Sequence, residues 1–580
     1  MEQFSAKELI RGDLEDFSAG AVPVVHKTKG YAVWDLTAPP FLWPRGDGLT
    51  LCIPSVFCSS KGEALDDKIP LLRAEQKLQQ AVLRLLKCFD VKANAVCSNL
   101  RAEQEYFLID RQGYLLRPDL VFAGRTVVGA GFFQGVEGLD LSLHTARVLA
   151  YIRECEELAL TLGIPLKTWR REEALAQHKI APLCEKGSIA VDHNLLLMEL
   201  MRQKAHSHDL AILFHEKPFA SFKGSSKHMY WSLTTDTGLD LLAPDAHRLI
   251  FLTLFTSILR AVQKHGLLFL ASASSAGNDH RLADQALIPS VFSVSLESGL
   301  EKTISDLIHE QAGERSWSHD EVNLIDRDRL PFFSFSGNEF VFRAMGAAGS
   351  CALPLAILNA TVAESLHLIL DEAESSLGDG SSPDLKAKSV QSVLQKILKE
   401  AHPMIFDRDF KETQLPKSYH AYAALLDKSA VQAFDGILSE RQLHNYYELW
   451  IERYAKIVQG EAGLLMDLFR TKILPVCLAF QENWARSLHA VLETGGVPQP
   501  RLSDGLSVFS ELINQAIAAI EAVDRVVHQT EDLGSDAKAR VFCELVAAKM
   551  DKARALIDRL ETMADDALWP LPKYRELLVF

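Results

Sequence analysis

The sequence predicts an α+β protein, with a mixed region of strands and helices over residues 1–350 and an all-helical region over residues 351–580. Two observations support this division. Short runs rich in β-branched and aromatic residues, bounded by Gly and Pro, are concentrated in the first region. Long stretches with apolar residues every three or four positions fill the second region, as expected for amphipathic helices.

In the first region, we expect strands at 32–37, 49–54, 105–110 and 340–345, and helices at Pro70–Cys88 and Leu141–Leu162. In the second region, the helical period covers Ala356–Ser376, Leu385–Glu400, Leu443–Leu492, Leu506–Val527 and Ser535–Ala567. The stretch Leu443–Leu492 fits either two helices or a bent one, with Gly460 and Pro475 as candidate breaks. The last two stretches predict a helical hairpin, which follows a Gly- and Pro-rich linker at Thr494–Pro500.

Composition excludes several classes of protein. The 580 residues carry 61 Lys and Arg against 76 Asp and Glu, and the net charge of −15 argues against a broad nucleic-acid surface. The apolar run Leu249–Leu259 is too short to span a bilayer, and the mixed-charge N-terminus does not resemble a signal peptide. The nine cysteines are scattered without ligand-like spacing, which favours a reducing, cytoplasmic location and no membrane association.

The first pattern with chemical content is Glu103-Gln104-Glu105. On a strand, the first and third residues share a face, so the two carboxylates would project together. Such a pair repels itself unless a cation lies between its members. Taken alone, the pattern fits either a solvated strand edge or a metal site.

Three further clusters follow along the chain. Gly224, Ser225 and Ser226 permit close backbone approach to a ligand, and His228 is either a metal ligand or a hydrogen-bonded structural histidine. The segments Asn278–Leu282 and Asp326–Arg343 carry arginines that suit phosphate or carboxylate binding, although spacing alone equally fits surface ion pairs.

The order of these clusters resembles the type III glutamine synthetase family. The resemblance rests on the Glu103–Glu105 strand, HEKPFA (215–220) with KGSSKH (223–228), ASASSAGNDHRL (271–282), and RDR (327–329) with FSGNEFVFR (335–343). It extends to GEALDDKIPLLR (62–73), RPDLVFAGRT (117–126), IAVDHNLLLMELM (189–201), WSLTTDTGLDLL (231–242) and WPLPKYRELL (569–578), and so covers essentially the whole chain.

The resemblance implies a catalytic domain at 37–350, an antiparallel sheet surrounded by helices, with a remnant of a β-grasp domain at 1–36 and a helical domain at 351–580. It implies ligation of glutamate and ammonia with ATP through a γ-glutamyl phosphate, assisted by Mg²⁺ or Mn²⁺. By the same similarity, Glu103, Glu105, Glu172 and His228 match metal ligands, Gly224 matches a glutamate-binding backbone, Ser232 and Arg329 match nucleotide-binding positions, and Arg281, Arg329 and Arg343 match arginines that hold substrate carboxylate or phosphate.

The chain departs from the family pattern at positions that matter for the chemistry. Lys179 and Val341 stand where two metal-binding glutamates belong, Lys223 replaces a glutamate-binding Asn, and Ala286 replaces the carboxylate of a flap over the substrate. The resemblance also implies a longer N-terminal β-grasp domain that lends residues to the neighbouring subunit, of which we expect only the remnant at residues 1–36 here.

Lys179 changes a ligand of charge −1 to a group of charge +1. We expect its ammonium to neutralise Glu105 and Glu172 where a metal would otherwise lie; the alternative is that it swings into solvent. Three functions remain open: a ligase that has lost activity and binds or regulates, an active ligase with an altered substrate, and an assembly module. The resemblance implies ATP and glutamate as ligands, and hexameric rings, a dodecamer or co-assembly with an intact paralogue.

Overall fold

The computed structural model describes most of the chain. The described residues are 30–45, 48–59, 62–132, 146–172, 174–244, 247–283, 294–295, 304, 332–375, 383–406, 416–494, 497 and 499–578. Arg329, Ala286, most of the expected β-grasp remnant and the start of the helix expected at Leu141–Leu162 lie outside these ranges.

The central feature is a nine-stranded, mostly antiparallel sheet. Its order is β11-β12-β13-β10-β5-β7-β6, and β8 and β9 also pair with β5. The long strand β5 (Val96–Asp110) therefore crosses the middle of the sheet and contains the strand expected at 105–110. The remaining strands are β6 (Leu166–Arg171), β7 (Gln177–Pro182), β8 (Glu185–Lys186), β9 (Leu210–Leu213), β10 (Lys227–Thr235), β11 (Val294–Ser295), β12 (Phe333–Ser336) and β13 (Glu339–Phe342).

Two small hairpins precede the sheet. Strand β1 (Gly30–Trp34) pairs with β4 (Ser55–Ser59), and β2 (Phe41–Arg45) pairs with β3 (Gly48–Cys52). The strand expected at 32–37 ends earlier, at Trp34, and the strand expected at 49–54 ends at Cys52. Pro54 limits the second strand because it has no backbone N–H to donate to a ladder.

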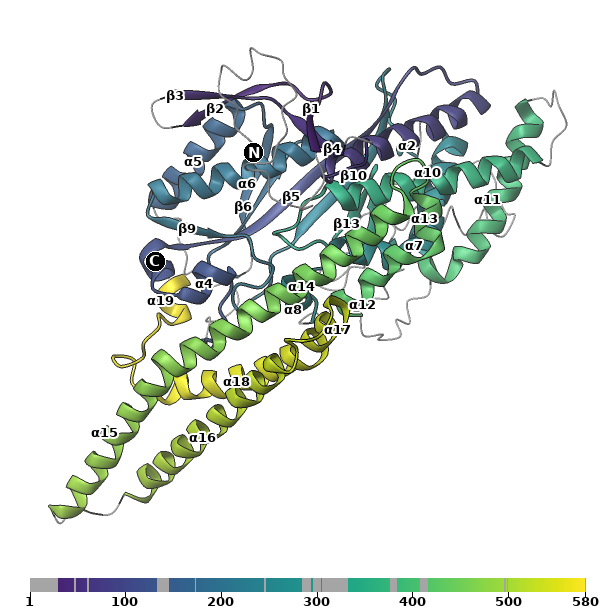
Figure 1. The fold of residues 1–580 in the computed structure, drawn as a ribbon. Coiled ribbons are helices and arrows are strands. Elements are labelled where there is room, and N and C mark those ends of the chain that lie inside the picture. Colours follow the sequence, from purple (N-terminus) through teal and green to yellow (C-terminus); the bar gives the residue numbers. More distant parts are fainter. Residues whose placement is uncertain are drawn as a thin grey trace.

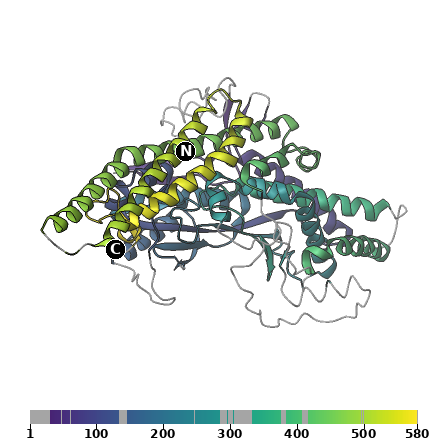
Figure 2. The same ribbon diagram turned by 90° about the horizontal axis from the view of Figure 1, so that it is seen from below.

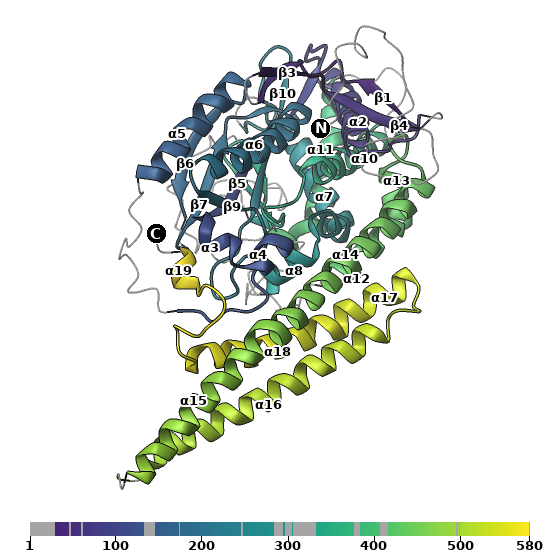
Figure 3. The ribbon, with the colours of Figure 1, turned by 60° about the vertical axis from the view of Figure 1, so that its left-hand side comes forward.

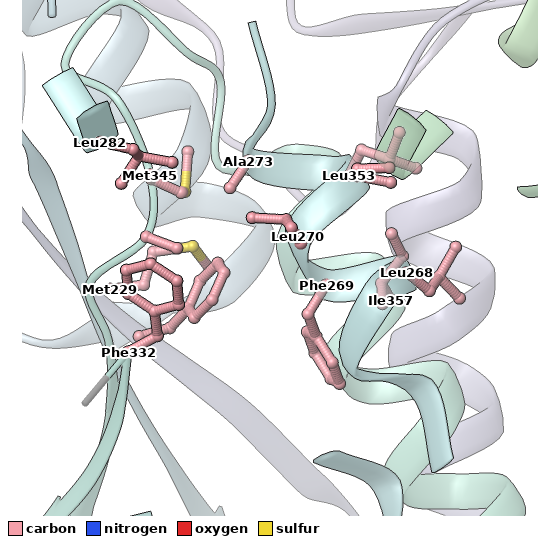
Figure 4. Packing of buried hydrophobic residues seen from close by; sticks show 14 of the residues in the cluster. Met229, Leu268, Phe269, Leu270, Ala273, Leu282, Phe332, Met345, Leu353 and Ile357 are labelled. Atoms are coloured by element: carbon pink, nitrogen blue, oxygen red, sulfur yellow. The ribbon is translucent and has the colours of Figure 1, made fainter. Parts of the chain in front are cut away.

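Helices from distant parts of the chain cover one face of the sheet. Helix α10 (Ala352–Ser375) packs against both α2 (Lys68–Cys88) and α7 (Arg248–Ala273), and the three helices share one hydrophobic core with β10 and β13 (Figure 1). Met229 and Phe332 approach this core from the sheet side, while Leu268 and Ile357 meet between α7 and α10 (Figure 4). A second core joins the other end of β5 to α5 (Ala146–Thr161) and α6 (Gly187–Ser207).

The helical region forms a long arm. Helix α14 (Glu440–Leu468) continues through a π-helical turn, Phe469–Ile473, into α15 (Leu474–Glu493), so the stretch expected as two helices or a bent one is a continuous rod (Figure 1). Gly460 does not interrupt it, and Pro475, the second residue of α15, follows closely on the π-helical turn.

The expected hairpin packs beside this rod. It consists of α16 (Pro500–His528), α17 (Ser535–Val541), a π-helical turn at Phe542–Val546, and α18 (Ala547–Met563). Figures 2 and 3 show these helices running side by side, with α15 and α16 projecting from the body. The remaining α-helices of the described residues are α3 (Arg111–Leu115), α4 (Pro118–Ala123), α8 (Ala276–Ala283), α11 (Pro383–Phe406), α12 (Ser418–Tyr422), α13 (Lys428–Ala433) and α19 (Tyr574–Leu578).

The end of the described chain returns to the sheet domain. The fully buried Arg117 donates from Nε to Asp119 Oδ1 (2.9 Å), from Nη2 to Asp119 Oδ2 (2.6 Å), and from Nη1 to the carbonyl of Pro572 (3.0 Å). Arg554 of α18 donates to the carbonyl of Thr126 (2.6 Å) and to the hydroxyl of Tyr574 (2.6 Å). These contacts fix α18 and α19 against the loop that follows α4.

Among the residues that the structure describes, two helices, α10 and α16, are long and apolar enough to cross a membrane when judged by length and composition only. Most of the apolar window of α10 is buried inside the protein, as in the core helix of a globular domain.

Candidate active site

One face of the central sheet carries the polar residues singled out in the sequence. Tyr230 on β10 lies opposite Arg101 on β5 and opposite Val341 on β13, while His228 lies opposite Glu103. Side chains alternate along a strand, so the neighbouring residues Met229, Trp231, Phe340 and Phe342 point to the other face and are buried in the core. Strand register therefore gathers the candidate residues on a single polar surface.

Lys179 on β7 lies opposite Glu105 on this surface. Its Nζ is 3.1 Å from Glu105 Oε1, 3.3 Å from Glu172 Oε1 and 3.7 Å from Glu103 Oε2. Only 7% of the Lys179 side chain is exposed, so the ammonium does not reach into solvent. The expectation that Lys179 contacts Glu105 and Glu172 is confirmed, and Glu103 is a third partner.

The turn between β6 and β7 brings Glu172 beside Lys179. Glu172 donates its backbone N–H to the carbonyl of Gln177 (3.0 Å), and Ala176 adopts a left-handed conformation with φ of 59°. Such a φ is uncommon for a residue with a Cβ, and here it indicates a tight turn. Arg170 on β6 donates from Nε to Glu172 Oε1 (3.1 Å), so this carboxylate is shared by two cations.

The electrostatics of the cluster follow from burial and from these partners. Burial alone would raise the pKa of Glu105, but the charge on Lys179 and two hydrogen bonds from Ser226 hold it below its ordinary value of 4.5. Burial alone would lower the pKa of Lys179, but the negative charges of Glu105, Glu172 and Glu103 raise it above 10.5. Glu105 and Lys179 are therefore both ionised at neutral pH.

His228 lies at the edge of the carboxylate cluster. Its Nε2 is 2.9 Å from Ser226 Oγ, and its Nδ1 is 3.9 Å from Glu103 Oε2. Ser226 in turn donates its backbone N–H and its hydroxyl to Glu105 Oε2, each at 2.7 Å. Burial lowers the pKa of His228 to about 3, so the ring is neutral at pH 7.

The family resemblance implies divalent metal at these residues, but their arrangement does not fit one. The Lys179 ammonium already lies among the carboxylates of Glu103, Glu105 and Glu172. Two unit charges 4 Å apart interact by about 4 kcal/mol at an effective dielectric constant of 20, so an added cation would meet strong repulsion. Within the described residues, no group of three or more His, Cys, Asp or Glu side chains is arranged to hold a metal ion.

The two described candidate arginines are held by neutral groups. Arg281 on α8 donates from Nε to Asn278 Oδ1 (2.7 Å) and from Nη2 to the carbonyl of Ala344 (2.6 Å). Arg343 donates to the hydroxyl of Ser334. Burial lowers the pKa of Arg281 to about 10 and also lowers that of Arg343, so both remain charged at neutral pH.

The glycine of the candidate substrate loop packs directly on Arg281. A Cβ at Gly224 would lie 2.6 Å from Arg281 Cγ and 2.6 Å from the carbonyl oxygen of Glu216, which no side chain tolerates. The loop backbone is thus pressed against this arginine. Lys223 is exposed beside it, and the buried Ser232 lies on the same sheet face as Tyr230, two residues further along β10.

Sequence reasoning missed three members of the polar face. Arg101 joins Glu103 to Glu339, and the ring of Tyr230 lies beneath its guanidinium. The sequence could have indicated Arg101, because it precedes Glu103 by two positions on β5 and alternate residues of a strand point to the same face. The contacts to β10 and β13 required the strand register.

We expect the stability of the protein to fall as the pH drops below 6.5, the ordinary pKa of histidine. Burial, followed by the charge of Arg125, lowers the pKa of His215 to about 3. Below pH 6.5 the unfolded chain therefore binds a proton at this histidine and the folded chain does not. Each such histidine lowers the free energy of unfolding by about 1.4 kcal/mol for every pH unit of the decrease. Urea unfolding of the His215→Gln variant at pH 5, 6 and 7 should show a shallower dependence than wild type. The exposed His489→Gln change should leave it unaltered, and equal slopes for all three proteins would contradict the expectation.

Three protein-family descriptions match the chain in order. They are glutamine synthetase type III N terminal at residues 1–74, glutamine synthetase catalytic domain at 84–284, and glutamine synthetase C-terminal domain at 389–491. Together with the sheet and its surrounding helices, these matches define a protein of the glutamine synthetase class, and the predicted fold class is confirmed.

Relatives that match almost the whole chain identify the family within the glutamine synthetase class. The chain is 35% identical to the type-3 glutamine synthetase of Dictyostelium discoideum, covering 99% of this chain and 83% of that protein. It is 32% identical to a glutamine synthetase of Bacteroides fragilis, covering 100% and 84%. A solved structure titled "Apo GmaS without ligand" matches with 14% identity and a TM-score of 0.49, covering 78% of this chain and 88% of that one. The chain belongs to the type III glutamine synthetase family.

Proposed function

We propose that this member of the family does not carry out metal-dependent ligation and instead acts as a binding and assembly subunit. The observation that carries the proposal is the position of Lys179, whose Nζ lies within 3.7 Å of Glu103, Glu105 and Glu172. These carboxylates are the residues that the family resemblance assigns to metal. The Lys179 ammonium already lies among them, where it repels a divalent ion.

The rest of the site supports binding of an anionic ligand. Arg281 and Arg343 keep their charge and have neutral hydrogen-bond partners, and Arg281 packs against Gly224. Guanidinium groups held in this way suit a carboxylate or a phosphate. The proposed subunit therefore binds glutamate or a phosphate-bearing ligand without turning it over, as part of a ring of its own copies or together with an intact paralogue.

The alternative is an active ligase with an altered substrate, which the retained Arg281, Arg343 and Gly224 favour. Two measurements on the full chain separate the proposals. Calorimetry with Mn²⁺ or Mg²⁺ plus ATP should detect no metal-dependent nucleotide binding, and a γ-glutamyl transfer assay should detect no turnover. Turnover of about 1 s⁻¹ or more, typical of enzymes, would reject the proposal in favour of the ligase. Native mass spectrometry, with and without an intact paralogue, would identify the assembly.

We expect the double change Lys179→Glu with Val341→Glu to create weak Mn²⁺ binding where wild type has none. The first change removes the resident ammonium, and the second adds a carboxylate to the same sheet face. Isothermal calorimetry measures the gain, with the size-matched Lys179→Met and Val341→Ile pair as the control. Equal Mn²⁺ affinity in wild type and the double variant would count against Lys179 as the cause.

A further inference from the structure

Arg101 is the second cation embedded in the carboxylate cluster. It donates from Nη1 to Glu103 Oε1 (2.6 Å) and from Nη2 to Glu339 Oε2 (2.9 Å), and its Cζ lies 3.7 Å above the centre of the Tyr230 ring. Tyr230 in turn donates its hydroxyl to Glu103 Oε2 (3.3 Å). Only 15% of the Arg101 side chain is exposed. Two carboxylates and an aromatic face thus hold the guanidinium in one orientation.

The position of Arg101 is linked to the loss of a carboxylate at Val341. Tyr230 lies opposite Arg101 on one side and opposite Val341 on the other, so the three residues form one row across β5, β10 and β13. Glu339 shares a face with Val341 because it precedes it by two positions on β13. The row that lacks a carboxylate at Val341 therefore contains a guanidinium, bound to the neighbouring carboxylates of Glu103 and Glu339.

Arg101 and Lys179 act at opposite ends of the cluster. Lys179 makes its closest contacts with Glu105 and Glu172 and is furthest from Glu103, whereas Arg101 binds Glu103 on its other carboxylate oxygen. Across the sheet face, the cations Arg170, Lys179 and Arg101 alternate with the carboxylates Glu172, Glu105, Glu103 and Glu339. Each carboxylate in this series has a cationic partner.

We propose that Arg101 is a resident counter-cation of the site, which excludes divalent metal at the Val341 end as Lys179 does at the Glu172 end. This inference rests on the proposed function and extends it. It implies that restoring the two missing glutamates is not sufficient for tight metal binding. Arg101 must also be removed, because its guanidinium occupies Glu103 and would face an ion bound between positions 103 and 341.

The test measures Mn²⁺ binding to the full-length chain by the loss of the free-Mn²⁺ electron paramagnetic resonance signal. The parent is the Lys179→Glu, Val341→Glu variant. Adding Arg101→Gln should lower the Kd for Mn²⁺ at least tenfold, whereas adding Arg101→Lys, which keeps the charge, should leave it within about twofold. The matched control is Arg84→Gln, since Arg84 also joins two carboxylates, Asp371 (2.8 Å) and Glu374 (2.5 Å), but on α2 and α10.

No change in Kd with Arg101→Gln would overturn the inference, as would equal gains with Arg101→Gln and Arg101→Lys, which would indicate a steric effect. Should circular dichroism show that the triple variant does not fold, the Val341→Glu, Arg101→Gln variant is decisive, because it restores the carboxylate at position 341 and removes the neighbouring guanidinium. Mn²⁺ should raise its Tm by several degrees without changing that of Val341→Glu alone, and an absent shift would overturn the inference. Mn²⁺ binding by wild type would reject the proposed function separately, because the effect of Arg101 is measured relative to its own parent.

Discussion

Replacing Lys179 with Met is expected to lower the free energy of unfolding by about 3–5 kcal/mol at pH 7, the usual cost of removing one partner from a buried ion pair. The change leaves Glu105 with only its Ser226 donors and leaves Glu172 with Arg170 alone. Repulsion among the carboxylates then destabilises the sheet face. Chemical denaturation followed by tryptophan fluorescence measures the loss.

The pH dependence of this stabilisation follows from the two pKa shifts. Glu105 has its pKa lowered from 4.5, so its contribution is present above pH 4.5 and is lost as the pH falls through the lower value in the folded state. Lys179 has its pKa raised from 10.5, so its contribution is complete below pH 10.5 and is lost above it. The difference between wild type and Lys179→Met should therefore be largest between these limits.

A surface lysine provides the control for this prediction. Lys396 pairs with Glu372 at 2.8 Å, but its side chain is 63% exposed, so Lys396→Met should produce no measurable change. If Lys179→Met were as stable as Lys396→Met, the cluster would not depend on its resident ammonium, and the reason for excluding metal would disappear.

Asp119→Ala should be similarly destabilising, by about 3–5 kcal/mol, through a different part of the molecule. Both Asp119 and Arg117 are fully buried, and Asp119 accepts two hydrogen bonds from Arg117 and one from the backbone N–H of Val127 (2.9 Å). Removing the carboxylate leaves a buried guanidinium without its counter-charge, which costs far more than an exposed pair. Urea unfolding measures the loss of stability.

The Asp119→Ala change should also loosen the attachment of the C-terminal segment, which can be measured separately from the overall stability. Arg117 also binds the carbonyl of Pro572, and the loop after α4 is held by Asp558 and Arg554 of α18. We expect limited proteolysis of Asp119→Ala to release the C-terminal segment earlier than in wild type. Asp566→Asn, in an exposed pair with Arg575, should leave the digestion pattern unchanged. Equal protection in Asp119→Ala and wild type would show that the buried pair does not fix the segment.

The parts of the fold that depend on local periodicity could be predicted from the sequence. The strand over Glu103 and Glu105 and the long helical stretches after Leu353 were predicted because their residue patterns repeat within a few positions. The π-helical turn at Phe469–Ile473 was not, because nothing in its composition distinguishes it from an ordinary helix. Instead of breaking at Gly460, α14 continues through it, since one glycine costs a helix only about 1 kcal/mol.

In the candidate site too, contacts that depend on the pairing of distant strands could not be predicted from the sequence. Lys179 could be recognised as a change of charge, and its contacts to Glu105 and Glu172 were expected. The role of Arg101 was not, because its partner Glu339 lies 238 positions away and becomes a neighbour only through the register of β5, β10 and β13. The Arg117 contact to Pro572 spans 455 positions, a distance over which no local pattern carries information.

Lys179 differs from a bound metal ion in one further respect: it is covalently part of the chain. A dissociable ion occupies its site according to its concentration and its affinity, so chelators, competing metals and cellular supply all alter the fraction of loaded protein. A tethered ammonium, which lies 3.1 Å from Glu105, has no such dependence. Every folded copy of this protein therefore carries the same charge state in its sheet face, whatever the metal status of its surroundings.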